Sequence, residues 1–210
     1  MKPKTTTLPN LADTSLIHQQ AIAAGEDHYG SWQYNVIDEF KSLSGDEIRQ
    51  RLEDRAFPYA VLLESWLHDF NIGTAIRNAN AFGAKEIFYV GNKKFDRRGC
   101  AGCYHYTPLK WLPTIDDLLK LKERYVFIGV DNIPGAKPIN DYDYEPNTLF
   151  IFGSEGVGIT PAMQAMCDDM IYIKQYGSIR SLNCGTASGI VLCDYTMKYE
   201  RKQQCNTQQI

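Results

Sequence analysis

The stretch Ile171-Tyr-Ile-Lys-Gln-Tyr-Gly-Ser-Ile-Arg-Ser181-Leu-Asn183 decides the fold of this 210-residue chain. It opens with a short apolar run, continues as a polar loop, and leads into a run of small and apolar residues at 184–197 that is typical of a buried helix. Polar loops held between buried elements commonly carry binding groups. The polar side chains of this loop include Ser178, Arg180, Ser181 and Asn183.

From residue 59 onwards, short apolar runs alternate with helical patterns. The predicted strands are 60–63, 86–90, 125–130, 149–152 and 170–173. Helices are predicted at 71–82 and 183–199, and after the capping residues Thr114 and Thr160. Buried strands that alternate with helices indicate an α/β domain with a mostly parallel sheet flanked by helices. The residues between these patterns, 91–107 and 131–147, are predicted to form long loops.

The first 57 residues lack this alternation and predict a helical N-terminal extension. Ser44-Gly-Asp-Glu47 is a capping box, in which Ser44 caps a helix and Glu47 occupies its third position. Phe57-Pro58 favours the end of that helix, because the residue before a proline avoids helical geometry. We predict three segments: the extension 1–57, the α/β domain 58–200 and a polar, frayed tail 201–210.

The overall composition indicates a globular protein with little capacity for indiscriminate nucleic-acid binding. Hydrophobic residues make up 44% of the chain and charged residues 22%, and the formal net charge is −3. A local basic cluster remains at Lys93, Lys94, Arg97 and Arg98. The N-terminus lacks an apolar signal core and no apolar run approaches the roughly 20 residues of a membrane span, so we expect a cytoplasmic protein.

The six cysteines show no spacing typical of a disulfide framework, and we expect most of them to be buried thiols. Cys100-Ala-Gly-Cys103 is a lone C-x-x-C with His105 nearby. A structural zinc site needs a second pair of ligands at suitable spacing, which the chain does not offer. We therefore predict no metal.

Two further stretches carry groups that suit a binding site. Gly153-Ser-Glu-Gly-Val-Gly158 directly follows a buried strand, where glycines let a backbone approach a ligand, although a plain glycine-rich turn remains an alternative. It matches neither the dinucleotide fingerprint nor a P-loop. Asn71 opens a predicted helix and Arg77 lies six residues on, either as a phosphate-binding group or as an exposed helix arginine. No histidine lies in these stretches, so a histidine base is not expected.

Together, the three stretches resemble the SpoU/TrmH family of RNA ribose methyltransferases within the SPOUT superfamily. The first family motif is similar to Asn71-Ile-Gly-Thr-Ala-Ile-Arg77 and the small-residue helix that follows it. The second is similar to Leu149-Phe-Ile-Phe-Gly-Ser-Glu-Gly156, and the third to Ser181-Leu-Asn183 before a helix of small residues. The three occur in order across about residues 58–199.

This resemblance implies a deep C-terminal trefoil knot, a homodimer formed through the helix that starts at Asn183, and S-adenosylmethionine as cofactor. Carried over by motif, the implied cofactor-binding residues lie in three loops. They are Val130, Asp131, Phe152, Gly153, Gly156, Ile173, Ser181 and Leu182.

The implied reaction is methylation of a ribose 2′-oxygen in structured RNA, with tRNA favoured over rRNA. Arg77 would engage an RNA phosphate and help to activate the hydroxyl, while Glu155, Ser181 and Asn183 would complete the catalytic site. Tyr104 or Tyr106 could stack bases. The implied RNA-binding residues are Asn71, Arg77, Lys93, Lys94, Arg97 and Arg98.

Two other functions stay open at this point. One is a catalytically inactive knotted RNA-binding protein, against which Arg77, Glu155 and Ser181-Leu-Asn183 argue because they are intact. The other is a nucleotide-binding α/β enzyme of a different class, which lacks its expected fingerprint in this chain.

Overall fold

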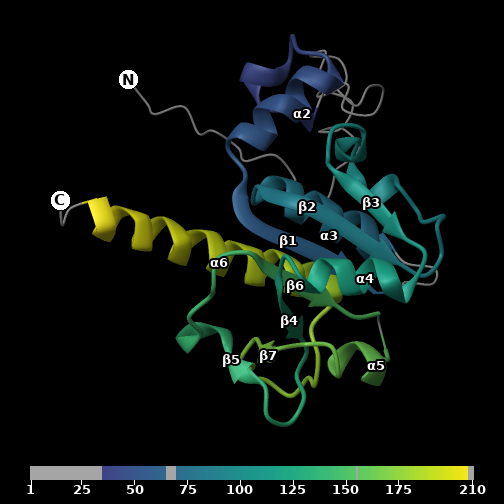
Figure 1. Ribbon diagram of the computed structural model, residues 1–210, viewed down its shortest axis with the longest axis vertical. Coiled ribbons are helices and arrows are strands. Elements are labelled where there is room, and N and C mark those ends of the chain that lie inside the picture. The colour runs from purple at the N-terminus through teal and green to yellow at the C-terminus, as the bar shows by residue number, and fades with distance from the viewer. Residues whose placement is uncertain (1–34, 65–69, 155, 208–210) are drawn as a thin grey trace, which may run out of the picture.

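The computed structural model describes residues 35–64, 70–154 and 156–207, and within them seven strands form one sheet (Figure 1). The strand order is β3-β2-β1-β6-β4-β7-β5, and every strand pair is parallel. The predicted α/β fold with a mostly parallel sheet is confirmed. The strands are β1 (Phe57–Leu63), β2 (Ala84–Val90), β3 (Leu109–Leu112), β4 (Val126–Val130), β5 (Lys137–Pro138), β6 (Thr148–Phe152) and β7 (Asp169–Tyr172).

Helices cover both faces of this sheet, as expected for parallel strands that are apolar on both sides. The helices are α2 (Gly45–Asp54), α3 (Phe70–Ala81), α4 (Ile115–Lys122), α5 (Pro161–Gln164) and α6 (Cys184–Thr207). Val61 and Leu63 of β1 pack in one core cluster with α3 and α6. Ala60 and Leu62, which point to the other face, pack in a second cluster with α4 and α5. No described helix is long and apolar enough to cross a membrane.

Close contact between α3 and α6 depends on small residues. The side chain of Asn78 donates hydrogen bonds to the carbonyl oxygen of Gly185, at 2.7 Å, and to the hydroxyl of Ser188, at 3.0 Å. A Cβ atom at position 185 would lie 2.9 Å from Thr74 Cγ2. The helix α3 ends at Ala81, and Gly83 follows it as predicted, with a φ of +67°, a left-handed conformation that glycine adopts without strain.

The described part of the extension packs on the α/β domain. The capping box at the start of α2 is confirmed: Glu47 N donates to Ser44 Oγ, and Ser44 N donates to Glu47 Oε2 at 2.8 Å. Phe40 and Ile48 are buried in the same cluster as β1 and α3. The helices predicted before residue 35 lie outside the described residues, so a helical extension over the whole of 1–57 stays a prediction.

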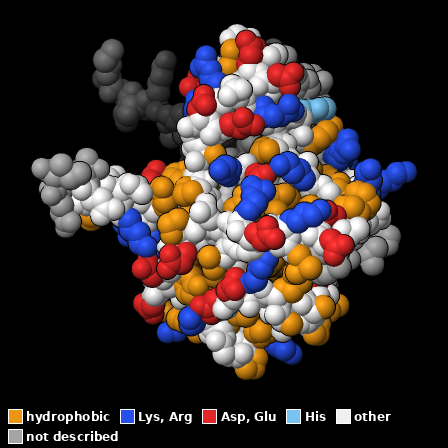
Figure 2. Space-filling model, viewed as in Figure 1, with side chains coloured by type: hydrophobic (Ala, Val, Ile, Leu, Met, Phe, Trp, Pro, Cys, Tyr) orange, Lys and Arg blue, Asp and Glu red, His pale blue; other side chains and the backbone are white. Residues whose placement is uncertain are grey.

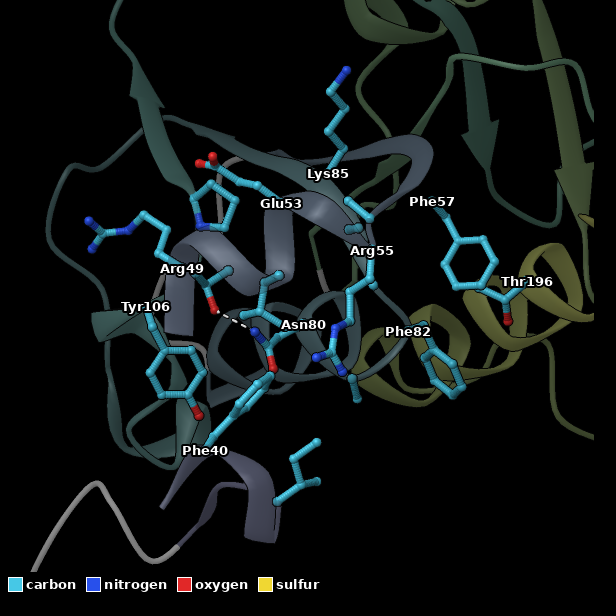
Figure 3. A pocket seen from close by; sticks show the side chains of 18 of the residues that line it. Phe40, Arg49, Glu53, Arg55, Phe57, Asn80, Phe82, Lys85, Tyr106 and Thr196 are labelled. Carbon is cyan, nitrogen blue, oxygen red and sulfur yellow. Dashed lines mark hydrogen bonds between the residues drawn. The ribbon is translucent and has the colours of Figure 1, made fainter. Parts of the chain in front are cut away.

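A hollow of about 430 Å³ separates this extension from the ends of α3 and α6. Figure 3 shows the ring of Phe40, the guanidinium of Arg55 and the ring of Phe82 around it, and the hydrogen bond of 3.0 Å from the Asn80 side chain to Thr107. Its lining includes Phe57 and Ala84, so this hollow lies at the amino ends of β1 and β2.

The structure differs from the prediction in two unpredicted strands, β3 and the two-residue β5, and in the length of α6. The edge strand β3 was not predicted, because it has only four residues, none of which is fully buried, so its sequence lacks a buried-strand pattern. The helix α6 continues to Thr207, where a frayed tail was predicted from residue 201. Residues 201–204 are Arg, Lys, Gln and Gln, which have good helix propensity and extend a helix without needing burial.

Candidate functional site

Three loops meet at the carboxyl ends of β4, β6 and β7. Because β6 and β7 both pair with β4 in parallel, these loops emerge on one edge of the sheet, where α/β proteins bind ligands. They enclose a cavity of about 670 Å³, within the range of about 300–1,000 Å³ typical of small-molecule sites. All eight residues predicted for the cofactor line it: Val130, Asp131, Phe152, Gly153, Gly156, Ile173, Ser181 and Leu182.

The glycine-rich loop after β6 folds so tightly that a side chain would not fit at Gly153 or Gly158. Ser154 and Gly158 exchange two backbone hydrogen bonds, of 3.1 and 2.9 Å. A Cβ atom on Gly153 would lie 2.1 Å from the carbonyl carbon of Gly158. Gly156 and Gly158 have φ values of +84° and +74°. The glycines therefore shape a wall of bare backbone on one side of the cavity.

The carboxylate of Asp131 joins the loop after β4 to this glycine-rich loop. Its Oδ2 atom accepts a hydrogen bond from Ile159 N at 3.0 Å, and its Oδ1 atom accepts one from Asn132 N at 2.8 Å. The Asp131 backbone N–H donates to the carbonyl oxygen of Ile171 at the end of β7, at 3.0 Å. Asp131 thus fixes the position of two walls of the cavity at once.

The loop after β7 is tied to the other loops and to α3. Asn132 Nδ2 donates to the carbonyl oxygen of Arg180 at 3.1 Å, and Cys184 Sγ donates to that of Gly153 at 3.3 Å. Asn183 Nδ2 donates to Asn71 Oδ1 at 2.9 Å. The first and third predicted motifs, 112 residues apart in sequence, therefore meet directly at the cavity.

Charge is sparse in the cavity. Among the described residues that line it, Asp131 and Arg180 are the charged ones. Gln175 also lines it, and its Oε1 atom is buried without a hydrogen-bond partner. A buried acceptor left unpaired costs about 1–3 kcal/mol, so a ligand with an amino group would relieve it. The sequence analysis missed Gln175, because one glutamine in a polar loop carries no recognisable pattern.

The predicted catalytic residues differ in where they lie relative to the cavity. Ser181 and Asn183 line the cavity. Arg77 lies on the exposed side of α3 and does not line the cavity of its own chain. Its positive charge acts instead on Cys103 and Tyr106; burial raises the pKa of Tyr106 to about 12, and Arg77 opposes that increase. Glu155 lies outside the described residues.

The basic cluster predicted to bind RNA is not a single patch of available charges. Arg98 folds back on Asp96, with Nε 3.1 and 3.0 Å from the two carboxylate oxygens, and this pair lowers the pKa of Asp96. Lys93 lies over the ring of Trp111, 5.0 Å from its centroid. Lys94 is exposed in the same loop. Arg97 lines a hollow beside β3.

Base stacking on Tyr106 was wrong, because this side chain is buried in the core. The ring of Tyr104 is half-buried and already has two neighbours. Its centroid lies 4.1 Å from that of His105, and the guanidinium of Arg97 lies 4.8 Å away.

Cys100 and Cys103 are buried behind α3 and hydrogen-bonded to each other. That hydrogen bond, with burial, raises the pKa of the Cys100 thiol, and it lowers the pKa of the Cys103 thiol. Within the part of the chain that the structure describes, no three His, Cys, Asp or Glu side chains are grouped as metal ligands would be.

Comparisons with known proteins agree with the cavity and the fold. Residues 58–193 match the model of the SpoU rRNA Methylase family. The chain is 25% identical over 183 residues to the 23S rRNA (guanosine-2′-O-)-methyltransferase RlmB of Acinetobacter baylyi, covering 83% of this chain and 69% of that protein. It is 25% identical over 165 residues to the tRNA (guanosine(18)-2′-O)-methyltransferase of Aquifex aeolicus, covering 74% and 76%.

Solved structures show the same architecture. The SpoU methyltransferase AviRb from Streptomyces viridochromogenes, in complex with the cofactor AdoMet, superposes with a TM-score of 0.62 and 26% identity. That match covers 67% of this chain and only 57% of the AviRb chain. The Aquifex aeolicus TrmH/SpoU tRNA modifying enzyme shares the fold, with a TM-score of 0.67, 22% identity and coverage of 76% and 84%. The chain therefore belongs to the SpoU rRNA methylase family, which confirms its resemblance to the SpoU/TrmH RNA methyltransferases.

Proposed function

We propose that this protein methylates a ribose 2′-oxygen in structured RNA with S-adenosylmethionine as methyl donor. The observation that carries the proposal is the convergence of all eight predicted cofactor residues on one cavity. The membership in the SpoU rRNA methylase family and the AdoMet complex of AviRb support it.

The cavity fits this cofactor by size and by its hydrogen-bonding groups. Gly153, Gly156 and Gly158 carry no side chains and allow close approach of a flat or bent ligand. Gln175 Oε1 would accept a hydrogen bond from an amino group, which S-adenosylmethionine carries at both ends. Arg180 would pair with the carboxylate of the methionine moiety. The bound cofactor supplies a methyl group already activated on a sulfonium, so the protein needs to do little covalent chemistry.

The remaining task is to position the 2′-hydroxyl and to assist loss of its proton. We assign that task to Arg77, whose guanidinium stays charged and can hold an RNA phosphate beside the reacting ribose. Because Arg77 does not line its own cavity, it would act at the cavity of a second subunit. Ser181 and Asn183 would shape the cavity rim, and Glu155 is retained as a proposed site residue.

A homodimer through α6 would supply that second subunit. Ile190 and Met197 are exposed on α6 and lie seven residues apart, which places them on one side of the helix. The side chain of Cys193 lies between them in sequence, with its Sγ 3.8 Å from Met197 Sδ. We propose that a second copy covers this stripe, and that the C-terminal segment of the domain threads into a deep trefoil knot.

Structured tRNA is the preferred substrate in this proposal, ahead of rRNA. The support is the extension, whose described residues 35–56 form a 3-10 turn and the helix α2 and show no separate folded domain of their own. Both RNA classes belong in the first screen, since the named relatives include enzymes for each.

The test combines cofactor titration, light scattering and a labelled-methyl screen. Calorimetric titration with S-adenosylmethionine and S-adenosylhomocysteine is expected to give micromolar binding to a dimer. Incubation with tRNA and rRNA pools is then expected to label RNA at bonds that resist alkaline cleavage. Label confined to bases would contradict ribose methylation, and a folded dimer that binds neither cofactor would favour an inactive RNA-binding protein.

A further inference from the structure

A second hollow, of about 720 Å³, follows the edge strand β3 and is defined here as the cationic groove. Its positive side chains come from five parts of the chain: the helix α2, the start of β2, the loop after β2, the strand β3 and the turn before β4. They are Arg49, Lys85, Arg97, Lys110 and Arg124. In Figure 2, Lys and Arg side chains gather on this face over the region of β2 and β3.

The charge of the groove is opposite to that of the whole protein. Its lining holds five cations and two carboxylates, Glu53 and Glu86, a formal net charge of +3. The complete chain carries −3. A concentrated positive region on an acidic protein creates a local field that attracts an anionic ligand to one place.

A shared carboxylate holds two of the cations in position. Glu86 is only 8% exposed, and it accepts hydrogen bonds from Lys110 Nζ and the Tyr125 hydroxyl, both at 2.6 Å, and from Arg124. Burial opposes ionisation, but these hydrogen bonds lower the pKa of Glu86, so the carboxylate is charged at neutral pH. The cationic side chains remain 57% and 51% exposed, and one negative charge neutralises only one of them.

Of the other three cations, Lys85 and Arg97 differ from Arg49, which is paired with a carboxylate outside the groove lining. Lys85 and Arg97 form no ion pair with a described carboxylate. Arg97 is held over the Tyr104 ring, which leaves its charge available. Arg49 donates to Asp46 Oδ1 and to the carbonyl oxygen of His105, each at 2.9 Å, and this fixes α2 against the loop beside the groove.

We propose that the cationic groove binds the phosphodiester backbone of the substrate RNA, away from the nucleotide that is methylated. An open hollow with dispersed cations and aromatic side chains suits a single-stranded polyanion better than a compact ligand. The proposal rests on the proposed function for the identity of the substrate. The 3-10 helix η4 (Cys103–His105) places Tyr104 in the groove and contacts α3, the helix that carries Arg77.

The test uses the full chain and a fluorescent oligouridylate of about 20 nucleotides, with binding measured by anisotropy as salt is varied. The double variant Lys85→Ala/Arg97→Ala removes two charges that have no acidic partner among the described residues. Each lost phosphate contact lowers the slope of log K against log salt by about 0.7 for a single strand, so a decrease of about 1.4 is expected. Affinity at about 50 mM salt is expected to fall at least fivefold.

Two matched variants separate the groove from overall charge. Lys41→Ala/Lys120→Ala removes the same charge from exposed lysines outside the groove and is expected to leave the slope within error of wild type. Lys85→Arg/Arg97→Lys keeps both charges and is expected to retain binding. Equal losses in the two alanine variants, or no measurable binding by wild type at about 50 mM salt, would overturn the groove.

Cofactor titration distinguishes failure of this inference from failure of the proposed function. The groove variants are expected to bind S-adenosylmethionine as wild type does, because neither residue lines the cofactor cavity. Normal cofactor binding with an unchanged salt slope would overturn the groove alone. A specific loss of oligouridylate binding in a protein that binds no cofactor would support the groove and contradict the proposed enzyme.

Discussion

The cofactor cavity and the cationic groove have similar volumes, about 670 and 720 Å³, but they are built from different materials. The cavity is made of loop backbone, glycines, and uncharged polar and apolar side chains, with Asp131 and Arg180 as its described charges. The groove is made of long charged side chains from distant parts of the chain. Recognition of a small molecule of fixed shape requires a defined backbone conformation. Binding of a polyanion requires only positive charges spaced so that they can reach successive phosphates.

This difference determines how strongly a single substitution should impair ligand binding in each region. The cavity depends on backbone conformations that few residues adopt, so single substitutions should damage it severely. The groove depends on a sum of modest charges, so its losses should be gradual and sensitive to salt.

The largest effect is expected at Arg77, which lines neither hollow. Arg77→Ala should reduce methyl transfer by about 10²–10⁴-fold, because positioning and proton removal lose their proposed cation. Binding of S-adenosylmethionine and of oligouridylate should both persist. Single-turnover kinetics would measure the loss of methyl-transfer rate, and the two binding assays would show whether the affinities are unchanged. Arg77→Lys, which keeps the positive charge but loses the paired N–H donors of the guanidinium, should recover part of the rate. Turnover close to wild type in Arg77→Ala would contradict its assigned role.

The next effect separates the cavity from the groove. Gly153→Ala puts a methyl group 2.1 Å from the Gly158 carbonyl carbon, so the loop must move and cofactor affinity should fall at least tenfold. Oligouridylate binding should remain near wild type, which would also show that the protein is folded. Gly177→Ala is the matched control, because a Cβ there meets nothing within 4 Å. Calorimetry would compare the two, and equal losses would contradict this account of the glycine-rich loop.

A smaller effect is expected at the contact between the first and third motifs. Asn71→Ala, Asn183→Ala and the double variant form a mutant cycle on the hydrogen bond of 2.9 Å between these side chains. The coupling free energy should be about 1 kcal/mol, the usual worth of one such bond. Urea unfolding of the four proteins would measure it. Additive changes would mean that the contact does not stabilise the junction at the cavity.

The smallest effect concerns acid stability at the groove. The pKa of Glu86 is lower in the folded protein than its ordinary value of 4.5. Its ionised form therefore stabilises the fold fully above about pH 4.5, and this contribution is lost as pH falls through the lower folded-state pKa. Unfolding free energy measured from pH 6 downward should fall less steeply in Glu86→Gln than in wild type. Glu53→Gln, which removes an exposed carboxylate of the same groove, should follow the wild-type curve.

The sequence allowed prediction of those features that depend on local residue chemistry. The caps at Ser44, Thr114 and Thr160 are confirmed, each accepting a hydrogen bond from a backbone N–H of the helix that follows. The cavity residues were predictable because glycines after a buried strand and the Ser181-Leu-Asn183 motif are unusual local patterns. Their functional roles are still predictions, although they line one cavity.

The groove and Gln175 could not be predicted in this way. Lys85, Lys110 and Arg124 are single cations in unrelated segments, and only the parallel order of the sheet and the unexpected strand β3 bring them near Arg97. At the basic cluster, the sequence did not show that the exposed side chain of Arg98 pairs with Asp96. RNA binding by this cluster stays a prediction.

The contact of Gly73 with the loop after β2 has a consequence for how this protein can diverge. A Cβ at position 73 would lie 2.8 Å from the Gly99 backbone, so α3 and this loop touch with no side chain between them. The loop is anchored there, while residues 91–94 are exposed and accept hydrogen bonds from Tyr89 and Trp111 at backbone carbonyl oxygens. Because these bonds involve the backbone of 91–94, side-chain substitutions there can accumulate without displacing α3. We propose that a new RNA preference can arise at this tip while α3 and its Arg77 stay in place.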